Sequence, residues 1–94
     1  MQTFHRSYIS HRISRHAAIR MQQRSIPSVV VDLLLDLTDS LPAGSGCVAH
    51  RFNADSWAEA KRCLGQRATQ IDRYRNAYVV VGENGTVVTA ARLH

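Results

Sequence analysis

The strongest constraint on the fold of this chain is a hairpin pattern near its C-terminal end. Two valine-rich segments, residues 78–81 and 86–90, flank the dipeptide Asn84-Gly85. Asn-Gly is preferred in two-residue hairpin turns because both of its residues adopt positive φ at low cost. We therefore predict two antiparallel strands joined at this dipeptide.

The turn also predicts the register of the two strands. With a two-residue turn, Val80 pairs with Thr89 and Ala77 pairs with Arg92. Cross-strand partners share a face of the sheet, so Thr89 and Arg92 point to opposite faces unless a bulge intervenes. The more apolar of the two faces then consists of Val79, Val81, Val88 and Ala90.

Upstream of the hairpin the pattern predicts two consecutive helices. Ser14 is the expected N-cap of a first helix that ends near Arg24. Pro27 is well placed in the first turn of a second helix that runs to about Leu37. This second helix is apolar around nearly its whole circumference, so we expect it to be buried.

A further strand and a third helix are expected between the second helix and the hairpin. Residues 47–52 have the pattern of a short strand, and Ser56 begins a sequence of capping-box form that starts a helix ending at Gly65. Residues 66–76 fit either a strand or a loop. The order predicts an α+β fold, with N-terminal helices packed on a small antiparallel sheet.

The chain length is that of one domain. With 94 residues the core is modest, and we expect residues 14–94 to form a single α+β domain. Residues 1–13 have no clear hydrophobic periodicity, and we predict that they form a basic N-terminal arm or a short edge strand.

Positive charge is gathered at the beginning of the chain. Five arginines and three histidines precede the first acidic residue, Asp32, whereas seven basic and seven acidic residues follow position 31. The whole net charge of +5 therefore lies in the first third of the sequence. Charge concentrated on one element indicates an anionic partner, although a solvated helix face is the alternative explanation.

The first helix carries the candidate chemistry. His16, Arg20 and Arg24 are spaced four apart, which places them along one side of a helix. His16 falls in the first helical turn, where the helix dipole and the nearby Arg15 and Arg20 disfavour the imidazolium form. A neutral histidine beside arginines suits proton removal from a ribose 2′-hydroxyl while the cations hold a phosphate. These residues therefore predict metal-independent cleavage of RNA.

No cofactor or metal ion is predicted. Zinc ligation by Cys47, His50 and Cys63 is disfavoured, because residues 47 and 50 point to opposite faces of a regular strand. Two cysteines are too few for a disulfide framework. The N-terminus lacks the apolar segment of a signal peptide, and the longest apolar run is too short to span a membrane. We expect a cytoplasmic protein with no membrane association.

The motif S-x-H-x-x-x-R-M-x-x-R-x-I over residues 14–26, the apolar second helix and the V-V-T strand at 87–89 resemble a bacterial family, domain-of-unknown-function family 4258. That family is distantly similar to BrnT and RelE/ParE-type toxins. The resemblance implies a RelE/barnase-like topology and places the candidate catalytic residues at His16, Arg20, Arg24 and Thr89. It also implies an acidic antitoxin-like protein as a partner.

The leading hypothesis is a small, basic, toxin-like endoribonuclease. In it His16 is the base, Arg20 and Arg24 bind the scissile phosphate, and Thr89 or Tyr78 orients the RNA substrate.

Arg15, Tyr78 and Arg92 are the predicted substrate-binding residues. The alternative is a non-catalytic module that uses the same basic helix to bind nucleic acid or a protein. In a third interpretation the charged side of the first helix is only exposed to solvent and binds no partner. The oligomeric state and the RNA target are not predicted by the sequence.

Overall fold

The computed structural model describes residues 12–93 of the chain. The predicted basic arm is therefore described only at its last two residues, and residues 1–11 lie outside the described part. Those two residues form strand β1 (Arg12–Ile13), which confirms an edge strand at this point. β1 pairs in parallel with strand β5 (Thr86–Arg92).

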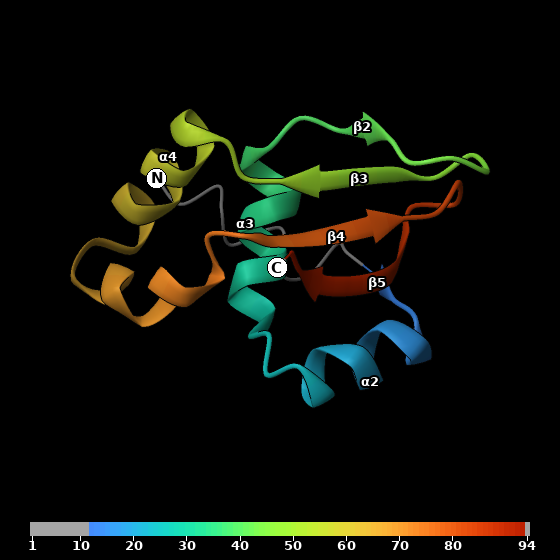
Figure 1. Cartoon of the computed structure of the whole chain (residues 1–94), viewed down its shortest axis with the longest axis horizontal. Coiled ribbons are helices and arrows are strands. Elements are labelled where there is room, and N and C mark those ends of the chain that lie inside the picture. The colour runs from blue at the N-terminus through green and yellow to red at the C-terminus, as the bar shows by residue number, and fades with distance from the viewer. Residues whose placement is uncertain (1–11, 94) are drawn as a thin grey trace.

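A mixed sheet lies at the centre of the domain (Figure 1). Within residues 12–93 it has five strands in the order β1-β5-β4-β3-β2. The remaining strands are β2 (Leu41–Pro42), β3 (Val48–Arg51) and β4 (Ala77–Val81), and every pair except β1–β5 is antiparallel. The α+β class is confirmed, but the expectation of a purely antiparallel sheet is corrected by the parallel edge strand.

The register of the C-terminal hairpin is confirmed over most of its length. Ala77 pairs with Arg92, and Val80 pairs with Thr89, as a two-residue turn predicts. Since residues 89 and 92 differ by an odd number with no bulge between them, Thr89 and Arg92 lie on opposite faces of the sheet.

The turn itself differs from the prediction. Val81 pairs with Val87 across a register shift, so Val88 is an additional residue in β5. The Gly85 N–H donates to the Gly82 carbonyl at 3.0 Å, and Gly85 has a φ of +83°. A longer loop with a left-handed glycine and a compensating bulge thus replaces the two-residue turn. As a consequence Val87 is fully buried and Val88 only partly, which corrects the expected apolar face.

The first two helices form where they were expected. Helix α2 (Arg15–Gln23) has Ser14 as its N-cap, and helix α3 (Ser28–Leu37) follows Pro27. Five consecutive residues of the ten in α3, Val30 to Leu34, are buried, in agreement with the apolar pattern. The predicted bounds of these two helices are therefore confirmed to within one residue.

The third helix begins earlier than predicted. Helix α4 (Ala54–Leu64) has Asn53 as its N-cap, and Ser56 is the N3 residue of the capping box rather than the cap. The Asn53 Oδ1 accepts from the Ser56 backbone N–H, and the Ser56 Oγ accepts from the Asn53 N–H, both at 2.8 Å. The helix ends before Gly65, as expected, because Gly65 has the positive φ that glycine tolerates.

The ambiguous segment after α4 is a 3₁₀ helix, η1 (Gly65–Tyr74). The expectation of a strand or a loop was therefore wrong. Ile71 and Tyr74, three residues apart, point into the core, which is the spacing of one 3₁₀ turn.

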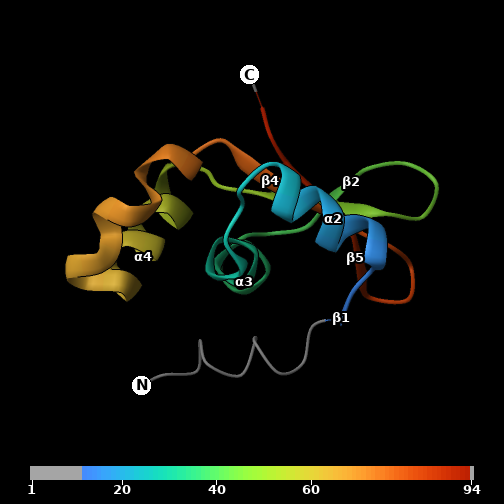
Figure 2. The same ribbon diagram turned by 90° about the horizontal axis from the view of Figure 1, so that it is seen from below.

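The helices cover one face of the sheet and leave the other open. Figures 1 and 2 show α3 behind the sheet, α2 along its β5 side, and α4 and η1 at one end. Within the described residues no helix covers the face opposite α3. We call this the open face. None of the helices that the structure describes has the length and apolar character needed to cross a membrane.

Burial of α3 predicts where truncation destabilises the fold. Leu33 is 0% exposed, whereas Leu41 on β2 is 47% exposed. Leu33→Ala is expected to lower the free energy of unfolding by about 2–5 kcal/mol, because it removes buried methyl groups and leaves a cavity. Leu41→Ala, the matched control, is expected to change it by less than about 0.5 kcal/mol. Urea denaturation followed by circular dichroism measures both values, and equal losses would contradict the packing described here.

Candidate functional site

Helix α2 is attached to β5 at both of its ends. At its start, the Ser14 N–H donates to the Val87 carbonyl at 2.9 Å, and the Ser14 Oγ accepts from the Ala17 N–H at 3.0 Å. At its end, an Arg24 guanidinium N–H donates to the Ala90 carbonyl at 3.1 Å. Helix and strand therefore run in the same direction, and the side chains of α2 are placed along the edge of β5.

His16 and Arg20 are in contact on the surface of α2. The Arg20 Nε–H lies 3.4 Å from the His16 Nε2, and an Arg20 Nη1–H lies 3.4 Å from the Gln23 Oε1. In this contact the Arg20 Nε–H is the donor, so the ring nitrogen Nε2 of His16 is the acceptor. His16 occupies the first turn of α2, as predicted, and its side chain is exposed.

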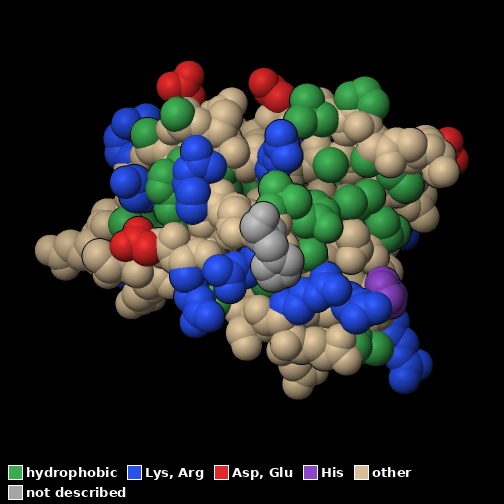
Figure 3. Space-filling view, in the orientation of Figure 1, with side chains coloured by type: hydrophobic (Ala, Val, Ile, Leu, Met, Phe, Trp, Pro, Cys, Tyr) green, Lys and Arg blue, Asp and Glu red, His purple; other side chains and the backbone are tan. Residues whose placement is uncertain are grey.

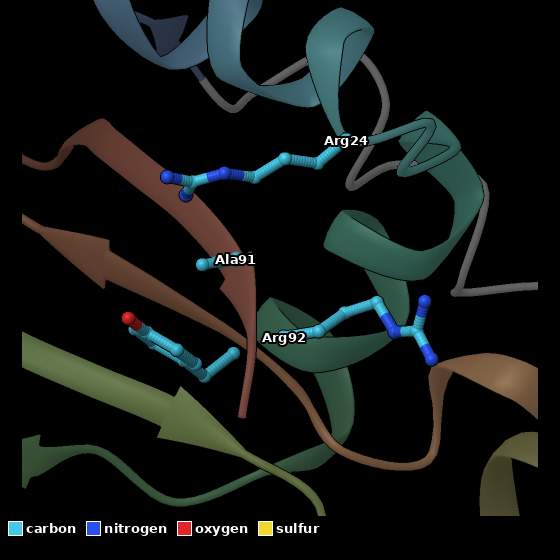
Figure 4. Close-up of a pocket in the computed structure, with 4 residues that line it drawn as sticks. Arg24, Ala91 and Arg92 are labelled. Atoms are coloured by element: carbon cyan, nitrogen blue, oxygen red, sulfur yellow. The ribbon is translucent and has the colours of Figure 1, made fainter. Parts of the chain in front are cut away.

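A pocket of about 450 Å³ lies beside the end of β5. Arg24, Tyr78, Ala91 and Arg92 line it. The structure thus brings together three of the residues that the sequence singled out, from α2, β4 and β5. Figure 4 shows Arg24 extending from the end of α2 across β5.

The two arginines of the pocket do not converge. Figure 4 shows the Arg92 side chain extending away from Arg24 and Ala91. Its guanidinium carbon lies 5.7 Å from the centroid of the Tyr74 ring, and its Nε–H lies 3.4 Å from the Asn76 Oδ1. Arg92 therefore forms part of the wall, while Arg24 is the guanidinium that crosses the open face.

The strand register adds a residue that sequence reasoning missed. Arg51 pairs with Tyr78, and Tyr78 pairs with Ala91, so the three lie in one line on the open face. Arg24 continues this line from α2. We call Arg51, Tyr78, Ala91 and Arg24 the arginine–tyrosine row. The sequence holds no local signal for Arg51, because β3 and β4 are joined by a long helical connection rather than a turn.

The other two predicted site residues, Thr89 and Arg15, lie outside the pocket. Thr89 is half-buried on β5 and pairs with Val80, on the same face as Tyr78. Arg15 is exposed at the first position of α2, and within residues 12–93 its side chain has no hydrogen bond or ion pair. The predicted set is thus divided into a His16–Arg20 pair on α2, the pocket residues Arg24, Tyr78 and Arg92, and two residues outside both groups, Thr89 and Arg15.

An apolar row lies next to the arginine–tyrosine row. Leu41, Ala49, Val80 and Thr89 are successive cross-strand partners on β2 to β5. Figure 3 shows apolar side chains grouped over these strands, with a band of Lys and Arg side chains below them over α2. The open face is therefore apolar in its middle and cationic along the α2 side.

Acidic residues gather on a different part of the surface. A second pocket, of about 260 Å³, lies where α3 ends and α4 begins, and Asp39, Asp55 and Glu59 are among its lining residues. In Figure 3 acidic side chains lie along the upper edge and at the sides, with basic side chains near them at the upper left, and none lies in the band over α2. The band over α2 is thus a cationic surface without acidic side chains in this view.

The residues considered for zinc have other surroundings. The His50 Nδ1 lies 2.9 Å from the Thr38 Oγ1. The pKa of the Cys63 thiol is raised, first by burial and then by the Glu59 carboxylate. Among the described residues no group of three His, Cys, Asp or Glu side chains is close enough to hold a metal ion.

Comparisons with known protein families, with curated proteins and with solved structures find no match to this chain. The resemblance to family 4258 and to RelE/ParE-type toxins therefore stays a prediction, and the arguments below rest on the geometry.

The N-cap of α2 holds His16 in place, and its contribution can be measured. Ser14→Ala is expected to lower the free energy of unfolding by about 1 kcal/mol, because the Ala17 N–H loses its partner. Ser28→Ala is the matched control, since Pro27 caps α3 without a side-chain hydrogen bond. Chemical denaturation that shows no difference between the two variants would contradict the capping role.

Proposed function

We propose that this protein binds RNA on the open face, with its arginines along α2 holding the phosphates. The observation that carries the proposal is the Arg24 guanidinium, which is fixed to the Ala90 carbonyl beside a pocket that Tyr78 also lines. One N–H of Arg24 is used in that bond, and a guanidinium has five. A cation that is already positioned loses little side-chain entropy when it binds a phosphate.

The charge of α2 supports the same proposal. The helix has no acidic residue in its first turn, and no acidic residue occurs anywhere before Asp32. Arg20 and Arg24 are four residues apart on one side of α2, and Arg12 on β1 and Arg15 at the first position of α2 add positive charge near the beginning of the helix. Successive cations beside exposed aromatic and apolar surface are typical of proteins that bind single or unpaired nucleic-acid strands.

RNA binding is tested by a pair of charge-matched variants. Arg24→Gln is expected to weaken binding of a fluorescein-labelled RNA oligonucleotide about tenfold and to lower the salt slope by about one, because one phosphate contact is lost. Arg62→Gln removes an equal charge from α4, where Arg62 pairs with Glu59, and is expected to change the affinity much less. Fluorescence anisotropy at several salt concentrations measures both.

No salt-dependent binding by the wild-type protein would refute the proposal. The same oligonucleotide made of DNA is the second arm, because the 2′-hydroxyl is the group by which a protein distinguishes RNA from DNA.

Metal-independent RNA cleavage is the second candidate function. The observation that favours it is the contact between the His16 Nε2 and the Arg20 Nε–H, on the same side of α2 as Arg24. In this chemistry the 2′-hydroxyl loses its proton to His16 as its oxygen bonds to phosphorus, and the 5′-oxygen leaves with a proton from water. His16 and Arg24 are about 12 Å apart along the helix axis. We infer that Arg20 would hold the scissile phosphate and Arg24 a neighbouring one.

Cleavage predicts a specific effect of His16. His16→Gln is expected to lower the cleavage rate about 10²–10⁴-fold, because the general base is lost, while RNA binding stays close to that of the wild type. The assay follows end-labelled RNA on gels with a chelator present, so that no metal ion contributes. If the wild-type protein binds RNA but does not cleave it, the proposed cleavage is refuted and only the RNA-binding function stands. An acidic antitoxin-like partner would bind the arginines of α2 that are proposed to hold the phosphates. This partner stays a prediction.

A further inference from the structure

Tyr78 differs from the other described aromatic residues in what surrounds its ring. The Tyr74 side chain is 5% exposed, and the guanidinium carbons of Arg73 and Arg92 each lie 5.7 Å from its ring centroid. Its hydroxyl donates to the Ser25 carbonyl. The Tyr74 ring is therefore buried and already packed against side chains of the same protein.

The remaining two aromatic rings of the described part are also paired. Phe52 and Trp57 pack edge to face with centroids 5.0 Å apart, and the Arg75 guanidinium carbon lies 5.9 Å from the Trp57 ring. Tyr78 is half-buried on the open face, and within residues 12–93 no ring or cation contact is made by its ring.

The neighbours of Tyr78 leave space beside the ring. Its partner on β5 is Ala91, whose methyl group is small, and both residues line the pocket of about 450 Å³. A volume of this size is at the lower end of ordinary small-molecule sites, so it suits one planar base rather than a duplex.

Arginines lie on both sides of this space. Arg51 is the exposed partner of Tyr78 on β3, and Arg24 crosses β5 beyond Ala91. Adjacent strands are about 4.8 Å apart, so the backbones of β3 and β5 are separated by about 10 Å. Arg51 and Arg24 thus belong to elements on opposite sides of β4, and two long cationic side chains placed in this way match a nucleotide with a phosphate at each end.

We propose that the arginine–tyrosine row is a subsite for one unpaired nucleotide of a single-stranded RNA. The base stacks on Tyr78 over Ala91, and Arg24 and Arg51 bind the phosphates that flank it. Bases in a duplex are stacked on one another and cannot reach the ring, so the ligand class is single-stranded RNA. This inference rests on the proposed RNA binding and adds Arg51 and the stacking role of Tyr78 to it.

The test separates stacking from charge. Tyr78→Leu keeps an apolar side chain but removes the ring, and it is expected to weaken binding of a single-stranded RNA about tenfold without changing the salt slope. Tyr78→Phe retains the ring and is expected to bind as the wild type does. Arg51→Gln is expected to lower the salt slope by about one, while Arg62→Gln is the charge-matched control. Circular dichroism confirms that each variant is folded.

The same strand annealed to its complement is the decisive second probe. Binding at least tenfold weaker to this duplex than to the single strand is the expected result. Equal affinity for duplex and single strand, or wild-type affinity in Tyr78→Leu, would overturn the stacking subsite and leave RNA binding intact. Equal effects of Arg51→Gln and Arg62→Gln would remove Arg51 from the subsite. If the wild-type protein binds neither RNA probe, the proposed RNA-binding function itself is refuted.

Discussion

The site depends on the attachment of α2 to the edge of β5. β1 covers only the beginning of β5, so the carbonyl groups beyond it would face solvent. Helix α2 occupies that edge, with the Ser14 N–H on the Val87 carbonyl at one end and Arg24 on the Ala90 carbonyl at the other. An exposed strand edge is a template for unwanted pairing, and covering it with a helix removes that hazard. The same attachment sets the basic side of α2 beside the open face.

The open face is a consequence of how the apolar residues are distributed. Helix α3 carries four of the six largest fully buried side chains, and the described part of the chain has one such helix for a sheet with two faces. The core therefore forms on one side, where Val79, Val87 and Ala90 belong to the same buried cluster as the α3 side chains. The other side keeps smaller or amphipathic residues such as Ala49, Tyr78 and Thr89. A surface of this kind tolerates water and still offers a flat, partly apolar platform to a ligand.

Local signals made part of the fold and the site predictable. The structure confirms the N-cap at Ser14 and the pairing of the two hairpin strands at Ala77 and Val80. Both features depend on residues that are close together in the sequence. The bulge at Val88 was not predicted, because the Asn84-Gly85 dipeptide fits more than one loop length. Arg51 was missed for a different reason. Its place beside Tyr78 arises from the pairing of β3 with β4, which are separated by α4 and η1 and have no turn to fix their register.

Arg24 links stability to binding in this structure. One of its N–H groups satisfies the Ala90 carbonyl, and the remaining donors of the same guanidinium lie at the pocket. The carbonyl withdraws little positive charge, so the cation keeps its full attraction for a phosphate while its position is set by the sheet. Arg92 shows the contrast, because its guanidinium is turned toward Tyr74 and Asn76 although its sequence position is next to Ala91. Proximity in sequence to Ala91 therefore does not decide which arginine can meet a ligand; the side of β5 on which each guanidinium lies does.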